Sequence, residues 1–581
     1  MKYKLLLSSF VVLVSAITTF TQTNYSNFAQ LSSRLTGIAS KSGGTAAVSS
    51  IGKSKGGKDL WLLTLGKGDA TKKPAILIVA GIEASHLAGT EIVVLMAEKM
   101  LASAGADSVA KLLETKTFYF IPSVNPDAQE QFSAKPKFER SGNATETDDD
   151  RDGKINEDPF EDLNNDGVIT MLRVEDPTGT FVVSKDDARV LVKADPAKGE
   201  VGKYLIMSEG TDNDKDGAFN EDGVGGVNPD KNFTFDYPIF VTGSGEYAAS
   251  ESETRALLDF LYKSPNIFAV ITFGPANNLT EAPKFDPSKV MGRIVKGPLQ
   301  KDATAMEQVS KLYNSRTGLK DAPTLPQTKG NFSQTAYYHA GRLSFTTSGW
   351  WVPKIEAAKD TSKSTAQITP AAVPQAGVGR GAGGRMGGMM GAAQAATTGA
   401  MAGEDDIKFL KWADKEKLAG AFVNWTAIQH PDFPNQKVEV GGIAPFAKIN
   451  PPVSYLKESA DKHFNFLTGL GKQMPEIELV NIKNESLGGG VSRITATILN
   501  KGLLPTYSEM GDKVRFVQKV KTELKLATGQ TIVSGRRLNL RPALGAGEKE
   551  EYSWLVSGVG KLIIEAGCAT AGIKAVEVIL K

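Results

Sequence analysis

The chain has 581 residues, 41% of them hydrophobic, so it can bury a large core and is long enough for two or three domains. Its 67 basic and 65 acidic residues leave a formal net charge of +2, which gives no electrostatic reason to expect nucleic acid as a partner. The single cysteine, Cys568, excludes an intrachain disulfide, and we expect it to be buried as a small apolar residue.

The N-terminus has the pattern of a secretory signal peptide over residues 1–23. Lys2 and Lys4 precede an apolar run over residues 5–17, and small polar residues follow. A membrane anchor is the weaker interpretation, because this run is short for a bilayer and no second such segment follows. The mature chain is therefore predicted to be secreted or periplasmic and to have no membrane span.

Residues 24–475 are predicted to form one α/β domain. The apolar patterns predict strands over 46–50, 60–65, 75–79, 117–122, 267–273 and 343–347, and helices over 88–102, 250–263, 404–418 and 453–467. Strand, helix and strand in this order favour a mixed, mostly parallel central sheet flanked by helices.

Four positions follow the carboxyl ends of predicted strands. Glu83 and His86 come after the strand 75–79, Gly274 after 267–273 and Ser348 after 343–347. Functional side chains of open α/β sheets gather at such ends, so we expect these positions to converge on one cleft.

Within the domain, an acidic insertion over residues 141–225 carries three similar loops. Asp-x-Asp-x-Asp-Gly begins at residues 148 and 212, each continuing to Asn-Glu-Asp, and Asp-x-Asn-x-Asp-Gly begins at residue 162. Alternate oxygen ligands with glycine at the sixth position suit calcium. The candidate ligands are Asp148, Asp150, Asp152, Asp158, Asp162, Asn164, Asp166, Asp212, Asp214, Asp216 and Asp222.

A solvated acidic loop is the alternative to calcium binding, but three repeats with glycine in register favour the ion. The glutamate that usually closes an EF-hand loop is absent, so these are not standard EF-hands. We expect bound calcium to stabilise the insertion by offsetting the repulsion among its carboxylates.

The last part of the chain changes in character twice. Residues 371–403 are rich in Gly, Ala and Met, which predicts a mobile loop interrupting the domain. Residues 476–581 are predicted to form a β-sandwich with a structural or a carbohydrate- or peptide-facing role. Its expected strands cover 477–482, 491–499, 514–526, 531–533, 552–556 and 576–580.

Several segments together resemble the M14 zinc carboxypeptidases. Residues 81–86 read Gly-Ile-Glu-Ala-Ser-His, similar to the family's His-x-x-Glu corner with the two ligand types exchanged. Residues 124–127 resemble Asn-Pro-Asp-Gly, and 226–233 resemble the segment Asp-Leu-Asn-Arg-Asn-Phe that binds the substrate carboxylate. Residues 250–256 resemble Ser-Glu-Pro-Glu-Thr-x-Ala, with Ser250 as a candidate helix N-cap. The resemblance covers roughly residues 45–470.

The resemblance implies a zinc site whose residues have changed. The family holds zinc with the corner His and Glu, here Glu83 and His86, and with a second His, where Gly274 offers no ligand. Its catalytic glutamate corresponds to Ser348, which is no general base near neutral pH without an activating partner. Among the other histidines only His339 is an obvious spare ligand, and packing between aromatic residues is the preferred interpretation of it.

The positions that anchor substrate have changed as well. The family's Asn-Arg pair corresponds to Asp230 and Lys231. Unlike the planar guanidinium of arginine, the lysine ammonium cannot form a bidentate pair of hydrogen bonds with a carboxylate. Arg140 lies at an offset that matches the family's oxyanion-stabilising arginine.

Three functions remain open on the sequence. The first is a non-catalytic family member whose cleft still binds a peptide or a cell-envelope ligand. The second is an active zinc carboxypeptidase that uses Glu83, His86 and an unrecognised third ligand. The third is a calcium-stapled surface protein with a vestigial cleft.

Overall fold

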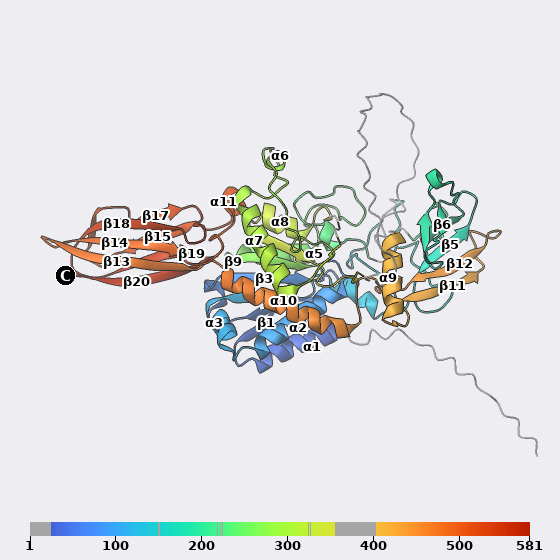
Figure 1. Ribbon diagram of the computed structural model, residues 1–581, viewed down its shortest axis with the longest axis horizontal. Coiled ribbons are helices and arrows are strands. Elements are labelled where there is room, and N and C mark those ends of the chain that lie inside the picture. Colours follow the sequence, from blue (N-terminus) through green and yellow to red (C-terminus); the bar gives the residue numbers. More distant parts are fainter. Residues whose placement is uncertain are drawn as a thin grey trace, which may run out of the picture.

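The protein is elongated and has three parts (Figure 1). The computed structural model describes residues 25–148, 152–217, 219–220, 222–223, 225–323, 325, 327–354 and 403–581. A central α/β body lies between a small β-rich lobe at one end and a C-terminal β-module at the other. The signal peptide and most of the Gly, Ala and Met-rich segment predicted above fall outside the described residues.

The central sheet has six strands, and the four that lead to the candidate site are parallel. Its spatial order is β1-β2-β4-β3-β9-β10, with β1 and β2 pairing antiparallel at one edge. The strands span Ala46–Lys53 (β1), Asp59–Leu65 (β2), Ala75–Ala80 (β3), Thr117–Ile121 (β4), Ile267–Phe273 (β9) and Leu343–Thr347 (β10). The mixed, mostly parallel sheet predicted from the sequence is confirmed.

Helices cover both faces of this sheet because the parallel strands are apolar on both sides. Along β3, Ile76 and Ile78 belong to one core cluster while Leu77 and Val79 belong to another, as expected when successive side chains alternate. The first face is covered by α1 (Phe28–Lys41), α2 (Leu87–Ala102), α3 (Asp107–Thr115), α7 (Gln300–Thr317) and α10 (Val453–Gln473). The second is covered mainly by α5 (Ser252–Lys263) and α8 (Phe332–Tyr338).

The start of α5 differs from the prediction. Its N-cap position is Glu251 rather than Ser250, and no side chain caps the helix there. The Ser250 hydroxyl instead donates to Glu251 Oε1 at 2.6 Å.

A second six-stranded sheet, which the sequence patterns did not reveal, forms the small lobe. Its order is β11-β12-β5-β8-β6-β7, so strands from the acidic insertion pair with strands after residue 403. The strands span Met171–Glu175 (β5), Phe181–Val183 (β6), Leu191–Lys193 (β7), Tyr204–Ser208 (β8), Phe422–Ile428 (β11) and Val438–Ile443 (β12). Helix α9 (Gly403–Lys415) packs its apolar face, including Phe409 and Trp412, against this lobe.

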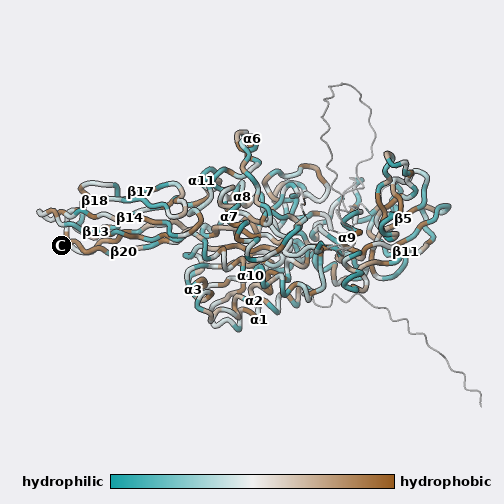
Figure 2. Tube along the Cα trace, viewed as in Figure 1, coloured by the Kyte–Doolittle hydropathy of each residue, from teal (hydrophilic) through white to brown (hydrophobic). Residues whose placement is uncertain are grey.

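The C-terminal module consists of two four-stranded sheets, consistent with the predicted sandwich. The orders are β13-β14-β18-β16 and β17-β15-β19-β20, and hydropathy alternates along the strands (Figure 2). The strands span Ile477–Gly488 (β13), Val491–Asn500 (β14), Val520–Lys525 (β15), Thr531–Ser534 (β16), Leu538–Arg541 (β17), Lys549–Ser557 (β18), Gly560–Cys568 (β19) and Gly572–Leu580 (β20). Cys568 is buried and free, as predicted.

The strand predicted over 514–526 is wrong in its first half. Residues Glu509–Val514 form helix α11, because Ser508 caps the backbone N–H of Gly511. The helix docks the module onto the central body: Leu504 and Met510 are buried in the core cluster of the central sheet. The two parts therefore share a core.

A buried carboxylate lies at this junction. Asp302 of α7 accepts hydrogen bonds from the backbone N–H groups of Glu509 and Met510, at 2.6 and 2.9 Å, and from the Tyr337 hydroxyl at 2.8 Å. The Asp302 carboxyl group thus satisfies two backbone donors at the N-terminus of α11. Burial raises the pKa of Asp302 to about 6.

We expect the stabilising contribution of Asp302 to fall as the pH rises. Its folded pKa lies above its ordinary value, so the contribution is fully present below about pH 4 and is lost as the pH rises through about 6. The free energy of unfolding should be measured by urea denaturation from pH 4 to 7 for the wild type and Asp302→Asn. The difference between them should shrink with rising pH, by on the order of 1 kcal/mol per pH unit. A difference that does not change with pH would show that Asp302 does not titrate there.

Candidate functional site

The candidate residues follow three adjacent parallel strands. Glu83 and His86 come after β3, Gly274 directly follows β9 and Ser348 directly follows β10. The backbone N–H of Gly274 donates to Thr347 O at 3.0 Å, so the ends of β9 and β10 remain paired up to these positions. All four positions therefore lie at the carboxyl edge of the sheet, where ligands of α/β folds bind.

The turn that carries Glu83 is fixed by a glycine and by a distant asparagine. Gly81 has a φ of +63°, and a Cβ there would lie 2.9 Å from Ser123 Cα, so only glycine fits. Asn450 donates from Nδ2 to Ser85 O at 2.8 Å and accepts from the Ala88 N–H at 2.9 Å. Asn450, which precedes α10, thereby ties the turn to the start of α2. No sequence signal identified it.

The Glu83 carboxylate is held by two donors. Asn228 Nδ2 donates to Oε2 at 2.9 Å, and the Ser85 hydroxyl donates to Oε1 at 3.3 Å. Burial raises the pKa of Glu83, and these hydrogen bonds oppose the shift. The residue is nevertheless partly exposed. Asn228 lies in the segment 226–233, whose comparison with the family pattern could have identified it.

His86 lies deeper than Glu83. It is 2% exposed, and its ring packs so closely on α2 that a Cβ at Gly89 would lie 2.8 Å from His86 Nδ1. The backbone of Ser348 lies within hydrogen-bonding reach of the ring, so His86 and Ser348 are neighbours. Burial lowers the pKa of His86 to about 4, so the imidazole is neutral near pH 7.

The positions after β9 and β10 differ in their surroundings. A Cβ at Gly274 would meet no atom within 4 Å, so there is open space beside this residue. Ser348 is 7% exposed, and among the described residues its hydroxyl has no hydrogen-bond partner. Beneath them, the Tyr313 hydroxyl hydrogen-bonds with Thr347 Oγ1 and His463 Nε2, at 2.9 and 3.0 Å. This buried network stiffens the end of β10.

The predicted substrate-binding residues are largely engaged with the protein itself. Arg140 donates to Gly142 O and Asn143 O, at 2.9 and 2.5 Å. Lys231 Nζ donates to Thr242 O at 3.2 Å. Asp230 Oδ1 accepts from the Phe332 N–H at 3.2 Å, and burial raises the pKa of Asp230 to about 7 with a further contribution from repulsion by Glu83.

Glu139 carries a carboxylate close enough to Glu83 to interact with it electrostatically, and the sequence did not point to it. Its carboxylate accepts from the Phe446 N–H at 2.6 Å. Desolvation of its carboxyl group is the main cause that raises its pKa, and the charge of Glu83 adds to it, although the residue as a whole is exposed to solvent. Glu83 is therefore within electrostatic range of two further carboxylates, those of Glu139 and Asp230.

The spare histidine, His339, is engaged elsewhere. Its Nδ1 hydrogen-bonds with Thr234 Oγ1 at 2.8 Å, and its ring lies edge-on to Phe235. The packing interpretation of this residue fits these contacts.

The three acidic loops share one local geometry. In each loop the sixth-position glycine donates its N–H to the first aspartate: Gly153 to Asp148, Gly167 to Asp162 and Gly217 to Asp212, at 3.0, 2.8 and 3.1 Å. These glycines have φ angles of +96°, +87° and +95°. The chain therefore curls in the same way in all three loops.

Only part of the predicted calcium ligand set comes together. Asp212, Asp214 and Asp216 have ligand atoms within 4.8 Å of one another, and across the described ranges no other three His, Cys, Asp or Glu side chains do. Asp158 belongs to the first loop in sequence but accepts from the N–H groups of Asn213 and Asn220 in the third, at 3.2 and 2.6 Å. Asp150 lies outside the described residues.

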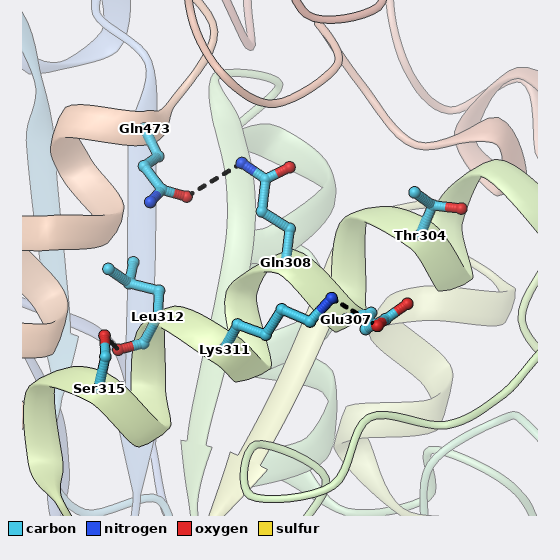
Figure 3. Close-up of a pocket in the computed structure, with 7 residues that line it drawn as sticks. All are labelled: Thr304, Glu307, Gln308, Lys311, Leu312, Ser315 and Gln473. Atoms are coloured by element: carbon cyan, nitrogen blue, oxygen red, sulfur yellow. Dashed lines mark hydrogen bonds and ion pairs between the residues drawn. The ribbon is translucent and has the colours of Figure 1, made fainter.

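A separate cavity of about 440 Å³ lies between α7 and α10 (Figure 3). It is lined by residues of α7 between Thr304 and Ser315 and by Gln473 of α10. The Gln308 amide donates to Gln473 Oε1, and Lys311 pairs with Glu307 on the same helix, at 3.2 and 2.7 Å. Its polar groups are paired with one another, so the chemistry of the chain is better sought at the strand ends.

Comparison with known proteins identifies the family. The family model described as zinc carboxypeptidase matches residues 32–348, more than half of the chain. The chain belongs to the M14 zinc carboxypeptidase family. Residues 476–579 match a model described as a domain of unknown function.

Individual relatives of this M14 chain are distant. Carboxypeptidase D of Drosophila melanogaster is 30% identical over 114 residues, which are 19% of this chain and 8% of that protein. Bovine thrombin-activatable fibrinolysis inhibitor, solved with tick carboxypeptidase inhibitor, is 16% identical over 56% of this chain and 86% of its own, with a TM-score of 0.35. Carboxypeptidase A from Helicoverpa armigera is 13% identical over 57% and 67%, with a TM-score of 0.34.

The described part of this M14 chain contains no helix with the length and apolarity needed to cross a membrane.

Zinc in this family needs three protein ligands and an open position for water. Of the three positions that the sequence predicted for these ligands, Glu83 and His86 carry a donor side chain and Gly274 carries none.

Proposed function

We propose that this M14 protein is secreted or periplasmic and that its cleft binds a peptide or cell-envelope ligand without hydrolysing it. The observation that carries the proposal is the state of the Glu83 carboxylate. It accepts hydrogen bonds from Asn228 and Ser85, while His86, the N-cap residue of α2, is buried and Gly274 contributes no donor.

The residues at the strand ends do not fit a zinc ion. Two candidate donors, Glu83 and His86, with no third at Gly274, make a much weaker site than three preset ligands. Ser348 adds a second and independent loss, because a buried hydroxyl without an activating base cannot deprotonate water near neutral pH. These features support binding over hydrolysis.

The proposal is tested on the purified full chain. We expect zinc by elemental analysis far below one ion per chain and no release of C-terminal residues from mixed peptides, with an active M14 carboxypeptidase as the positive control. Near-stoichiometric zinc accompanied by release of C-terminal residues would establish the alternative, an active enzyme with a non-standard ligand set. One observation favours that alternative: neutral His86 and Glu83 are both good zinc donors.

We also propose that calcium binds the acidic insertion. The convergence of Asp212, Asp214 and Asp216 supports this role, as does the geometry repeated in the three loops. If calcium binding by the insertion were the protein's only function, the chain would be a calcium-stabilised surface protein with a vestigial cleft. Failure of every peptide to bind, with calcium retained, would favour that third function.

A further inference from the structure

The connection between β9 and α7 carries an exposed tip. It contains the short helix α6 (Pro287–Val290), which projects from the central body (Figure 1). We call residues 284–296 the α6 tip. Within it, the Lys296 N–H donates to Lys289 O at 2.9 Å, so the chain returns to itself before α7 begins. The tip is therefore a closed loop that presents its side chains away from the body.

Two apolar side chains of the α6 tip face solvent. Met291 is 84% exposed and Ile294 is 64% exposed. Val295, the next residue, instead packs against the main core of the central body. The tip thus has its own apolar contact with the protein, and Met291 and Ile294 take no part in it. Single exposed apolar residues are ordinary on a protein surface, so the meaning of these two depends on what surrounds them.

Positive charge surrounds them. The four basic residues of the tip are all exposed: Lys284, Lys289, Arg293 and Lys296. With Asp286 as its one acidic residue, the tip has a net charge of +3, against +2 for the whole chain. The Asp286 carboxylate accepts from the Ser288 N–H and hydroxyl, at 3.0 and 2.7 Å, and lies 3.9 Å from Lys289 Nζ. It therefore offsets at most one of the four cations.

This combination fits the surface of an anionic lipid bilayer. Apolar side chains flanked by Lys and Arg lie at the boundary between headgroups and acyl chains, and each basic residue near anionic lipid raises affinity about fivefold. The centres of protein–protein interfaces are instead rich in Trp and Tyr held in pockets. The exposed apolar groups here are the flexible aliphatic side chains of Met291 and Ile294 on a projecting loop. The tip thus favours a membrane over an acidic protein.

We propose that the α6 tip docks the protein on an anionic lipid membrane. Met291 and Ile294 insert among the headgroups, and the basic residues of the tip contact the lipid anions. Docking of this kind is peripheral and reversible, and salt weakens it. The inference does not depend on what the residues at the strand ends bind.

Cosedimentation with vesicles tests the proposal. The mature chain is used, without the predicted signal peptide, because that segment would itself bind vesicles. At low salt, wild type is expected to bind vesicles of phosphatidylglycerol and phosphatidylcholine at least about tenfold more tightly than vesicles of phosphatidylcholine alone, and to be released as salt rises. Equal binding to both, or binding to neither, would overturn the proposal. Binding to soluble poly-glutamate without binding to vesicles would also overturn it and would indicate an acidic protein.

Charge variants locate the contact on the tip. Lys289→Gln with Arg293→Gln should weaken binding to the anionic vesicles by on the order of 20-fold, because two basic residues are lost. Lys72→Gln with Lys185→Gln is the matched control, since these lysines lie outside the tip and their side chains are 82% and 86% exposed. It should bind as wild type does.

Apolar variants test insertion. Met291→Ser with Ile294→Ser should weaken binding by about tenfold or more, because two apolar side chains no longer leave water. Val201→Ser with Val559→Ser, two residues that are 74% and 67% exposed, is the control and should have no effect. All variants change exposed side chains, so their thermal midpoints should stay close to wild type. If either tip variant binds as wild type does, the proposal is wrong. The wild-type comparison between vesicles needs no variant to fold.

Discussion

The variant Glu83→His/His86→Glu/Gly274→His is expected to take up about one zinc ion per chain, in contrast to the wild type. The three changes restore the family ligand set at the ends of β3 and β9. The open space beside Gly274 accommodates the new side chain at its Cβ. Elemental analysis after dialysis and calorimetric titration with zinc measure the result.

A fourth change should strengthen the restored site. Asn228→Asp gives the new histidine at position 83 a carboxylate acceptor, and such partners change metal affinity by about 10- to 100-fold. Gly274→Ala is the matched control, because it fills the same space without a ligand. A folded four-fold variant that takes up no zinc would show that these positions do not share one metal site.

The second large effect is expected on removal of calcium. At calcium concentrations about 100-fold above Kd, a bound ion contributes about 2.7 kcal/mol to the stability of the state that binds it. Chelation should therefore lower the thermal midpoint and open the insertion to trypsin at Lys154 and Lys215, which lie within the first and third loops. Readdition of calcium, but not of magnesium, should reverse both changes.

Variants of the third loop connect this effect to its ligands. Asp212→Asn with Asp214→Asn should reproduce the protease sensitivity in the presence of calcium, because Asp212 and Asp214 lie in the carboxylate cluster. Asp195→Asn changes an aspartate of the same insertion that caps a short helical turn and lies outside the loops, so it serves as the control. If chelation alters neither readout, or if the double variant is more stable than wild type, the loops are only a solvated acidic surface.

Predictions from local pattern succeeded where burial and chain geometry act over a few residues. The run Ala75–Ala80 is apolar throughout because both faces of a parallel strand are covered, so its pattern was visible. Of the strand predicted over 514–526, only Val520–Lys525 forms, because helix α11 extends to Val514 and its Met510 packs into the core of the central sheet. The strands of the insertion were missed because they are short, and because β5 pairs with β12, which follows it by more than 200 residues.

The amino-acid sequence by itself determined the family, the strands of the central sheet, and the residue types of the candidate site at their ends, because these depend on short motifs and on the periodicity of apolar residues. Only the tertiary structure decided what those residues contact. Asn228 reaches Glu83 across 145 positions, and Asn450 reaches Ser85 across 365. Such contacts are set by how the strands and helices pack, and packing brings together residues that no local pattern relates.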